Sequence, residues 1–135
     1  MKTLLLALTA LALTSGAAAA GTVTVHLTGV EARPGPIMAS LNTRDQFLRA
    51  APAYTATAAA TAGGVTLTFE NVTPGDYALM VMHDLNANDQ FDFGTDGWSV
   101  SNSAHQLMGP PVFDDHKFSV TAAPVTLNET LRYGF

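Results

Sequence analysis

Short runs in which apolar and polar residues alternate are the feature that most limits how this chain folds. Residues 22–30, TVTVHLTGV, alternate valine and leucine with threonine and histidine. The same period of two returns in residues 35–42, GPIMASLN, and in residues 63–72, GGVTLTFENV. Successive side chains of a β-strand point to opposite faces, so each run predicts a strand with one buried face.

The other segments fit the same architecture. Residues 75–84, GDYALMVMHD, are apolar on both faces, which is typical of a central strand covered on both sides. Residues 116–135 predict two closing strands around Pro124, and in residues 43–61 we expect a short helix followed by an edge strand. No crossover helices, which a parallel sheet needs, stand out. We predict an all-β fold: an antiparallel β-sandwich, immunoglobulin or prealbumin-like, with about seven strands.

The first twenty residues have the composition of a secretory signal peptide. A lysine near the start precedes an apolar run at residues 4–13, and Ala18-x-Ala20 fits the rule for cleavage. We expect cleavage after Ala20, which leaves residues 21–135 as a single domain in the periplasm or outside the cell. The apolar run is short for a membrane span, so we expect none in the mature chain.

Charge and cysteine content restrict the partners and the chemistry. The expected mature chain carries five Lys and Arg against eleven Asp and Glu, a net charge of −6 with neutral histidines. This balance argues against nucleic acid, which requires a basic surface, and against an anionic membrane. The absence of Cys excludes disulfides and thiolate chemistry. The expected partner is therefore an unidentified protein or glycan.

The segment from Asp84 to Asp96 concentrates oxygen-bearing residues directly after the apolar run. Donors fall at every second position: Asp84, Asn86, Asn88, Gln90 and Asp92. A tight loop around Ca²⁺ uses this spacing, because only every second side chain of a curling loop points at the ion. We predict a Ca²⁺ site in which the ligands are the side chains of Asp84, Asn86, Asn88 and Asp92, the carbonyl of Gln90, and Asp96 as a further candidate.

The loop also departs from the helix–loop–helix calcium pattern. Asp89 stands where that pattern usually has Gly, and Thr95 stands where it usually has a bidentate Glu. Flanking helices are not expected either. The alternative that the spacing leaves open is an Asx-rich turn held by its own hydrogen bonds.

Three segments around the loop resemble a bacterial family, the domain of unknown function 2141. They are HDLNANDQFD at residues 83–92, GWSVSN at residues 97–102 and GPPVFDDHKF at residues 109–118. The resemblance extends in outline from Thr22 to Tyr133. It implies an exported β-domain with this loop and with no established activity.

The four histidines lack the spacing of a transition-metal site, since neither H-x-H nor H-x-x-x-H occurs. His26 falls on the polar face of the first predicted strand, so we expect it to be exposed. His83 is in register with the apolar residues before it, so we expect it to face inward. There it can orient the loop through a hydrogen bond. His105 and His116 lie in irregular segments flanking residues 108–111.

A hydrolase is the enzyme alternative. Asp84, His83 and Ser101 supply the residue types for acid–base or nucleophilic chemistry. However, Ser101 is not part of a G-x-S-x-G motif, and alternating Asp and Asn suit a cation better than a proton-transfer pair. We expect a non-enzymatic module with a binding or structural role.

A recognition module for sugars or peptides is the third class. The aromatic residues near the polar loop, Trp98, Phe91, Phe93 and Phe113, can form a binding face. The competing interpretation is that they pin the loop to the core of the sandwich.

Overall fold

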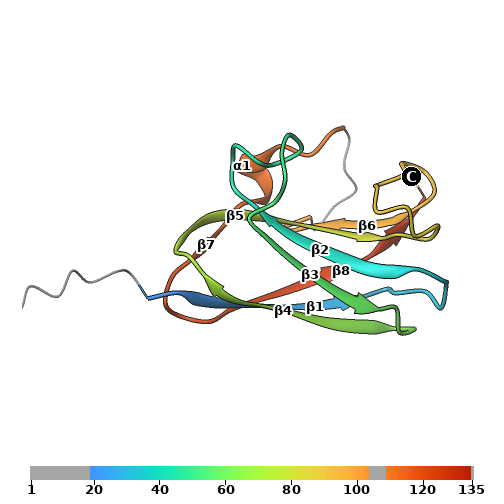
Figure 1. Ribbon diagram of the computed structural model, residues 1–135, viewed down its shortest axis with the longest axis horizontal. Helices are drawn as coiled ribbons and strands as arrows, with labels where there is room; N and C mark the ends of the chain where they lie inside the picture. Colours follow the sequence, from blue (N-terminus) through green and yellow to red (C-terminus); the bar gives the residue numbers. More distant parts are fainter. Residues whose placement is uncertain (1–18, 104–108, 135) are drawn as a thin grey trace, which may run out of the picture.

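The chain forms two β-sheets packed face to face in a computed structural model that describes residues 19–103 and 109–134 (Figure 1). The smaller sheet has the order β4 (Gly64–Val72), β1 (Gly21–Thr28), β8 (Val125–Thr130). The larger sheet has the order β3 (Tyr54–Ala59), β2 (Pro36–Asn42), β5 (Gly75–His83), β6 (Gly97–Val100), β9 (Arg132–Tyr133). Strand β7 (Phe118–Val120) also pairs with β5, and the short helix α1 (Phe113–His116) precedes it.

The predicted all-β sandwich is confirmed. The described strands pair antiparallel except β1 and β8, which run parallel. Residues 19–103 and 109–134 contain nine strands, where the sequence predicted about seven. The C-terminal segment accounts for part of the difference, because it contributes to both sheets: buried Leu131 separates β8 in the smaller sheet from β9 in the larger one.

The inner faces of both sheets supply one apolar core, as the alternation predicted. Val23, Val25 and Leu27 of β1 are buried, while His26 between them is exposed. The core residues facing them from the larger sheet include Ile37 and Leu79. Burying each such side chain stabilises the fold by roughly 1.5–3 kcal/mol relative to leaving it exposed.

Strand β5 is central, as predicted, but its outer face is covered only in part. Ala78 is fully buried beneath Phe47 and Phe113, whose rings meet edge to face at 5.9 Å. Met80 and Met82, further along the same face, are half-buried. The expectation of a strand covered along both faces therefore holds at its first half and is wrong at its second.

The short helix expected at the start of residues 43–61 is wrong: this segment forms hydrogen-bonded turns followed by β3. The amide of Phe47 donates to the carbonyl of Thr43, and the amide of Ala50 donates to that of Gln46, without forming an α-helix. Strand β3 is an edge strand of the larger sheet, as predicted.

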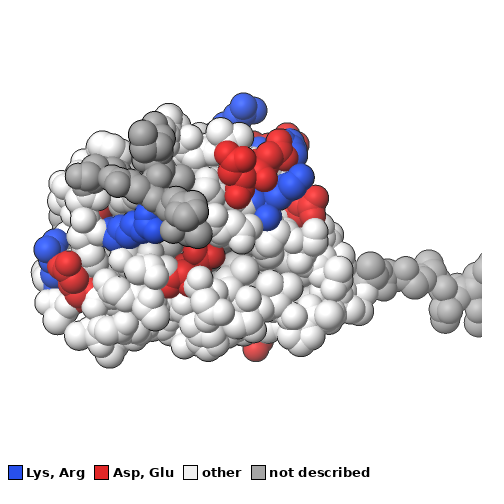
Figure 2. All heavy atoms as spheres, turned by 180° about the vertical axis from the view of Figure 1, so that it is seen from behind, with Lys and Arg blue, Asp and Glu red and all other residues white. Residues whose placement is uncertain are grey.

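The charged side chains on the face seen from behind in Figure 2 gather in a few clusters, with broad uncharged surface between them. One described cluster joins Arg44 and Lys117 to Asp114. Within residues 19–103 and 109–134, no helix has the length and apolar character to cross a membrane.

Candidate functional site

The aspartate loop, residues 84–96, connects β5 to β6 at one end of the sandwich (Figure 1). Asp84 is fully buried, and its amide donates to the carbonyl of Pro36 at 3.0 Å. Its carboxylate accepts two backbone N–H bonds, from Asn88 at 3.2 Å and from Asp89 at 2.8 Å. These bonds offset the cost of burying the charge and fold the first half of the loop back onto its start.

Asp96, at the other end of the loop, also accepts backbone N–H bonds with its carboxylate. Its side chain is also fully buried, and its carboxylate accepts the amides of Leu85 at 3.1 Å and Asp92 at 2.8 Å. Asp84 and Asp96 therefore close the loop reciprocally, one reaching forward and the other reaching back.

Three of the predicted calcium ligands meet at the exposed part of the loop. The side-chain amides of Asn86 and Asn88 both donate to the same carboxylate oxygen of Asp92, at 2.9 and 2.7 Å. The side-chain oxygen of Asn88 accepts the amide of Gln90 at 3.0 Å, which forms an Asx-turn. Loop curvature thus brings Asn86, Asn88 and Asp92 together, while Gln90 is exposed and takes part through its backbone.

The backbone at Asp89 has the conformation that a calcium-type loop requires. Its φ is 60°, in the left-handed region, and Ala87 two residues earlier has φ 53°. Asp tolerates this region better than most residues but less well than Gly. The sharp turn at the sixth position therefore forms without the usual glycine.

Among residues 19–103 and 109–134, no three His, Asp or Glu side chains are placed to hold a metal ion together. Ca²⁺ also takes amide and carbonyl oxygens, which are outside that set of side chains. In the arrangement described, the loop is held by its own hydrogen bonds, and Asp84 and Asp96 serve as acceptors for its backbone.

His83 faces inward and is fully buried, as predicted. Its Nε2 lies 3.2 Å from the carbonyl oxygen of Gly35, and a carbonyl only accepts, so Nε2 carries the hydrogen. In a neutral imidazole, Nδ1 is then the acceptor for the hydroxyl of Tyr133, which lies 2.6 Å away. That hydroxyl also accepts the amide of Glu31 at 3.1 Å, and burial raises the pKa of Tyr133.

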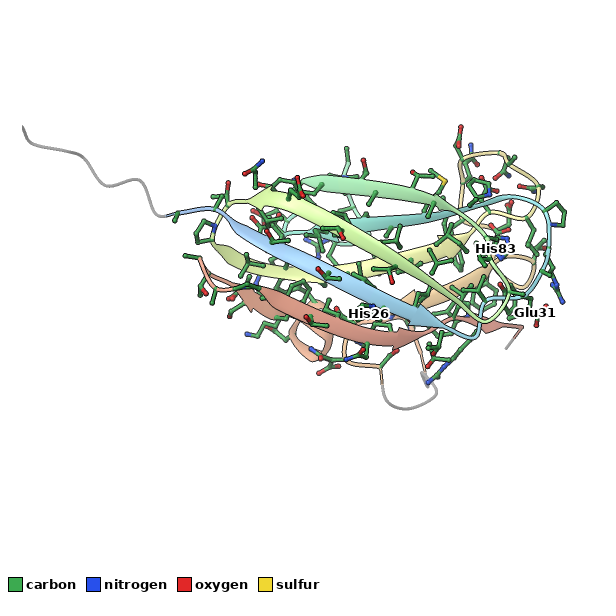
Figure 3. All side chains as sticks on the ribbon, turned by 90° about the horizontal axis from the view of Figure 1, so that it is seen from below. His26, Glu31 and His83 are labelled. Carbon is green, nitrogen blue, oxygen red and sulfur yellow. The ribbon has the colours of Figure 1, made fainter. Side chains whose placement is uncertain are left out.

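His83 consequently ties β9 and the turn before β2 to the start of the loop. Figure 3 shows His83 and Glu31 at the same end of the sandwich, whereas His26 lies on β1. Gly35, with φ 99°, presses against Asp84: a Cβ at that position would overlap the Asp84 carbonyl. The side-chain hydrogen bonds of His83 go to Gly35 and Tyr133, so it positions the loop through these neighbours.

The hydrolase residues are not gathered into one reactive group. Ser101 is fully buried, and its hydroxyl donates to the carbonyl of His116 at 2.6 Å while accepting the amide of Leu79 at 2.9 Å. The Nδ1 of His116 returns a bond to the Ser101 carbonyl at 2.8 Å. Ser101 thus joins the end of β6 to α1, while Asp84 and His83 bond elsewhere. His105 lies outside the described residues.

A groove of about 1360 Å³ lies on the outer face of the larger sheet, beside the aspartate loop. Trp98, Phe91 and Phe93 line it, as the recognition hypothesis required, whereas Phe113 packs on Phe47 instead. Its floor also contains Met38, Met80, Met82 and Arg132, which the sequence analysis did not single out. The available signal was the apolar character of the outward positions in residues 75–84, which were interpreted as covered on both faces.

A family model described as an uncharacterized protein conserved in bacteria, DUF2141, matches residues 25–128. The chain belongs to this family. The match confirms the resemblance inferred from the loop and its flanking segments, and it runs from β1 through the aspartate loop into β8. Comparison of this DUF2141 protein with curated proteins and with solved structures found no match.

Proposed function

We propose that this DUF2141 protein is an exported, non-enzymatic binding module whose aspartate loop binds Ca²⁺. Export is supported by the signal-like first twenty residues. The observation that carries the calcium proposal is the convergence of Asn86 and Asn88 on Asp92 in a loop whose sixth position is already left-handed.

The residues fit a hard cation in their chemistry. An Asn side chain exchanges its nitrogen and oxygen by a half-turn about its terminal bond, so Asn86, Asn88 and Asp92 offer three oxygens to an ion. The Asp84 carboxylate accepts two N–H bonds and retains acceptor capacity, since two carboxylate oxygens carry about four acceptor sites. Asp96 and the Gln90 carbonyl remain the further candidate ligands.

Charge supports the same proposal. The loop holds four aspartates and no Lys or Arg within thirteen residues. None of these carboxylates forms an ion pair with another described residue. A divalent cation would relieve their mutual repulsion and fix the loop, which carries Phe91 and Phe93 to the edge of the groove.

Thermal unfolding of the exported protein in calcium, magnesium and a chelator tests this function. The purified chain should begin at Gly21 by N-terminal sequencing. With a Kd of about 10⁻⁴ M, 10 mM calcium adds about 2.7 kcal/mol and raises Tm by about 10 °C. Magnesium should do less, because it prefers a strict octahedral shell with retained waters.

Asp92→Ala should abolish the calcium response, whereas Asp115→Ala, at an exposed aspartate of α1 outside the loop, should retain it. A midpoint unmoved by 10 mM calcium would leave the loop as an Asx-rich turn.

A second candidate function, molecular recognition, is favoured by the groove. Ligand sites are concave, mostly apolar and carry a few placed polar groups, and this groove has those properties.

A further inference from the structure

We infer that the groove binds a single-chain amphiphile with a long apolar body and a carboxylate head, of the fatty-acid type, with the head on Arg132. This ligand site goes beyond the proposed calcium function and does not depend on it. Three features carry the inference: the composition of the floor, the two walls, and the position of Arg132, the one Lys or Arg among the described residues that line the groove.

The floor is built from two rows of side chains that run across the strands. Cross-strand partners lie on the same face of a sheet, so each row follows directly from the register. The first row is Thr57, Met38, Met82, Trp98 and Arg132, taken from β3, β2, β5, β6 and β9 in turn. The second row is Thr55, Ser40, Met80 and Val100. All nine residues line the groove.

The groove has two walls, and the segments that form them lie at opposite ends of the strands of the larger sheet in Figure 1. Leu48 and Pro52, together with the Pro110–Pro111 pair before α1, form one wall. Phe91 and Phe93 of the aspartate loop form the other, and Phe93 is 75% exposed. The groove therefore runs across the strands, and four inter-strand spacings give it a length of about 19 Å from Thr57 to Arg132.

The floor favours an apolar chain over a peptide or a sugar. Its centre consists of three methionines and one tryptophan, and methionine adapts its shape to flexible apolar ligands. A peptide laid across these side chains would leave its backbone N–H and C=O groups without partners, which is costly. A hydrocarbon chain has no such groups, so it gains the burial without that cost.

Arg132 determines which end of the groove takes the carboxylate head. It is half-buried, one of its Nη atoms donates to the Ser103 carbonyl at 3.1 Å, and it forms no ion pair with another described residue. A guanidinium has five N–H donors in a planar fork that matches a carboxylate, so donors remain for a ligand. Asp89 also lines the groove, on the loop wall, where its negative charge disfavours an anionic head group.

Trp98 is the only tryptophan of the chain, and its place in the floor makes intrinsic fluorescence a direct reporter. The purified exported protein is titrated with palmitate below its micellar concentration, in calcium and again in chelator. Palmitate should shift the emission to shorter wavelength and saturate in both buffers. Saturation in chelator separates this inference from the calcium proposal, whose failure would leave it intact.

Variants and ligand analogues test the assignment of the head group. Arg132→Gln should weaken palmitate binding by about tenfold while leaving hexadecanol within about twofold, because only the acid uses the charged hydrogen bonds. Arg132→Lys should weaken palmitate binding less than Arg132→Gln does, because lysine keeps the positive charge but lacks the planar fork. Lys117→Gln removes one positive charge outside the groove, so it should leave the affinities for palmitate and hexadecanol unchanged.

Met38→Glu places a charge in the floor and should abolish binding of both ligands; circular dichroism and a thermal melt confirm that it folds. Three results would overturn the inference. The first is that Trp98 fluorescence does not respond to palmitate. The second is that Arg132→Gln binds palmitate as tightly as the unmodified protein does. The third is that the groove binds an apolar hexapeptide more tightly than palmitate. A dimer that shields Trp98 without added ligand, seen by sedimentation, would also overturn it in favour of a second copy.

Discussion

The outer faces of the two sheets have opposite chemistry although their inner faces share one core. On the smaller sheet, the outward residues of β1 and its neighbours are largely threonines, with His26 hydrogen-bonded to Thr66 at 3.2 Å. On the larger sheet, the corresponding face presents Met38, Met82 and Trp98. A solvated face needs no explanation, but a contiguous apolar face on an exposed sheet marks a site of interaction.

The largest expected effect is on stability, and it tests whether the inner faces of the two sheets contribute equally to the free energy of unfolding. Leu27 of β1 and Leu79 of β5 are both fully buried in the shared core. Leu27→Ala and Leu79→Ala should each lower the free energy of unfolding by about 2–5 kcal/mol, measured by urea denaturation. A loss below about 1 kcal/mol at either position would show that one sheet contributes little to the core.

An exchange of outer-face chemistry sharpens the comparison further. Met38→Thr gives the larger sheet the residue type of the smaller one, and Thr68→Met does the reverse on β4. Both positions face outward, so each change in unfolding free energy should stay within about 1 kcal/mol. Only Met38→Thr should weaken palmitate binding in the Trp98 assay. Equal palmitate affinity in the two variants would contradict a functional difference between the faces.

The smallest expected effects are on the pH dependence of stability. They concern one carboxylate on each side of the sandwich, and the pKa values of the two carboxylates shift in opposite directions. Hydrogen bonds from Arg44, then Lys117, lower the pKa of exposed Asp114 from 3.8 to about 2. Its contribution to stability is present above about pH 4 and is lost as pH falls toward 2. Burial raises the pKa of Glu129 above 4.5, so its contribution is present at lower pH and is lost as pH rises through the raised value.

Thermal midpoints measured from pH 2 to 7 check the direction in which each carboxylate changes stability. Asp114→Asn should flatten the acid limb of the stability profile. Glu129→Gln should remove the loss of stability above pH 4.5, while its side-chain amide oxygen still accepts the backbone N–H of Asn102. Both effects should be small because solvent screens the groups. A steeper acid limb in Asp114→Asn would contradict the ion-pair assignment.

The aspartate loop shows how far residue spacing reaches. The pattern located the loop, and it marked position 89 as the sharp turn, where the backbone is left-handed. It also grouped Asn86, Asn88 and Asp92, which the structure brings together. It did not reveal that Asp84 and Asp96 are buried and bonded to the loop backbone, because that depends on how β2 and Gly35 pack against the start of the loop.

The strands and their inner faces follow from local sequence patterns, because burial on one face of a strand imposes a period of two along the chain. Long-range contacts decide which strands pair, how the chain changes sheets at Leu131, and which outer face carries the groove. Met38, Met82, Trp98 and Arg132 are far apart in the chain and become neighbours only through the register of four strands. Register arises from long-range packing, so no local pattern could predict that these four residues become neighbours.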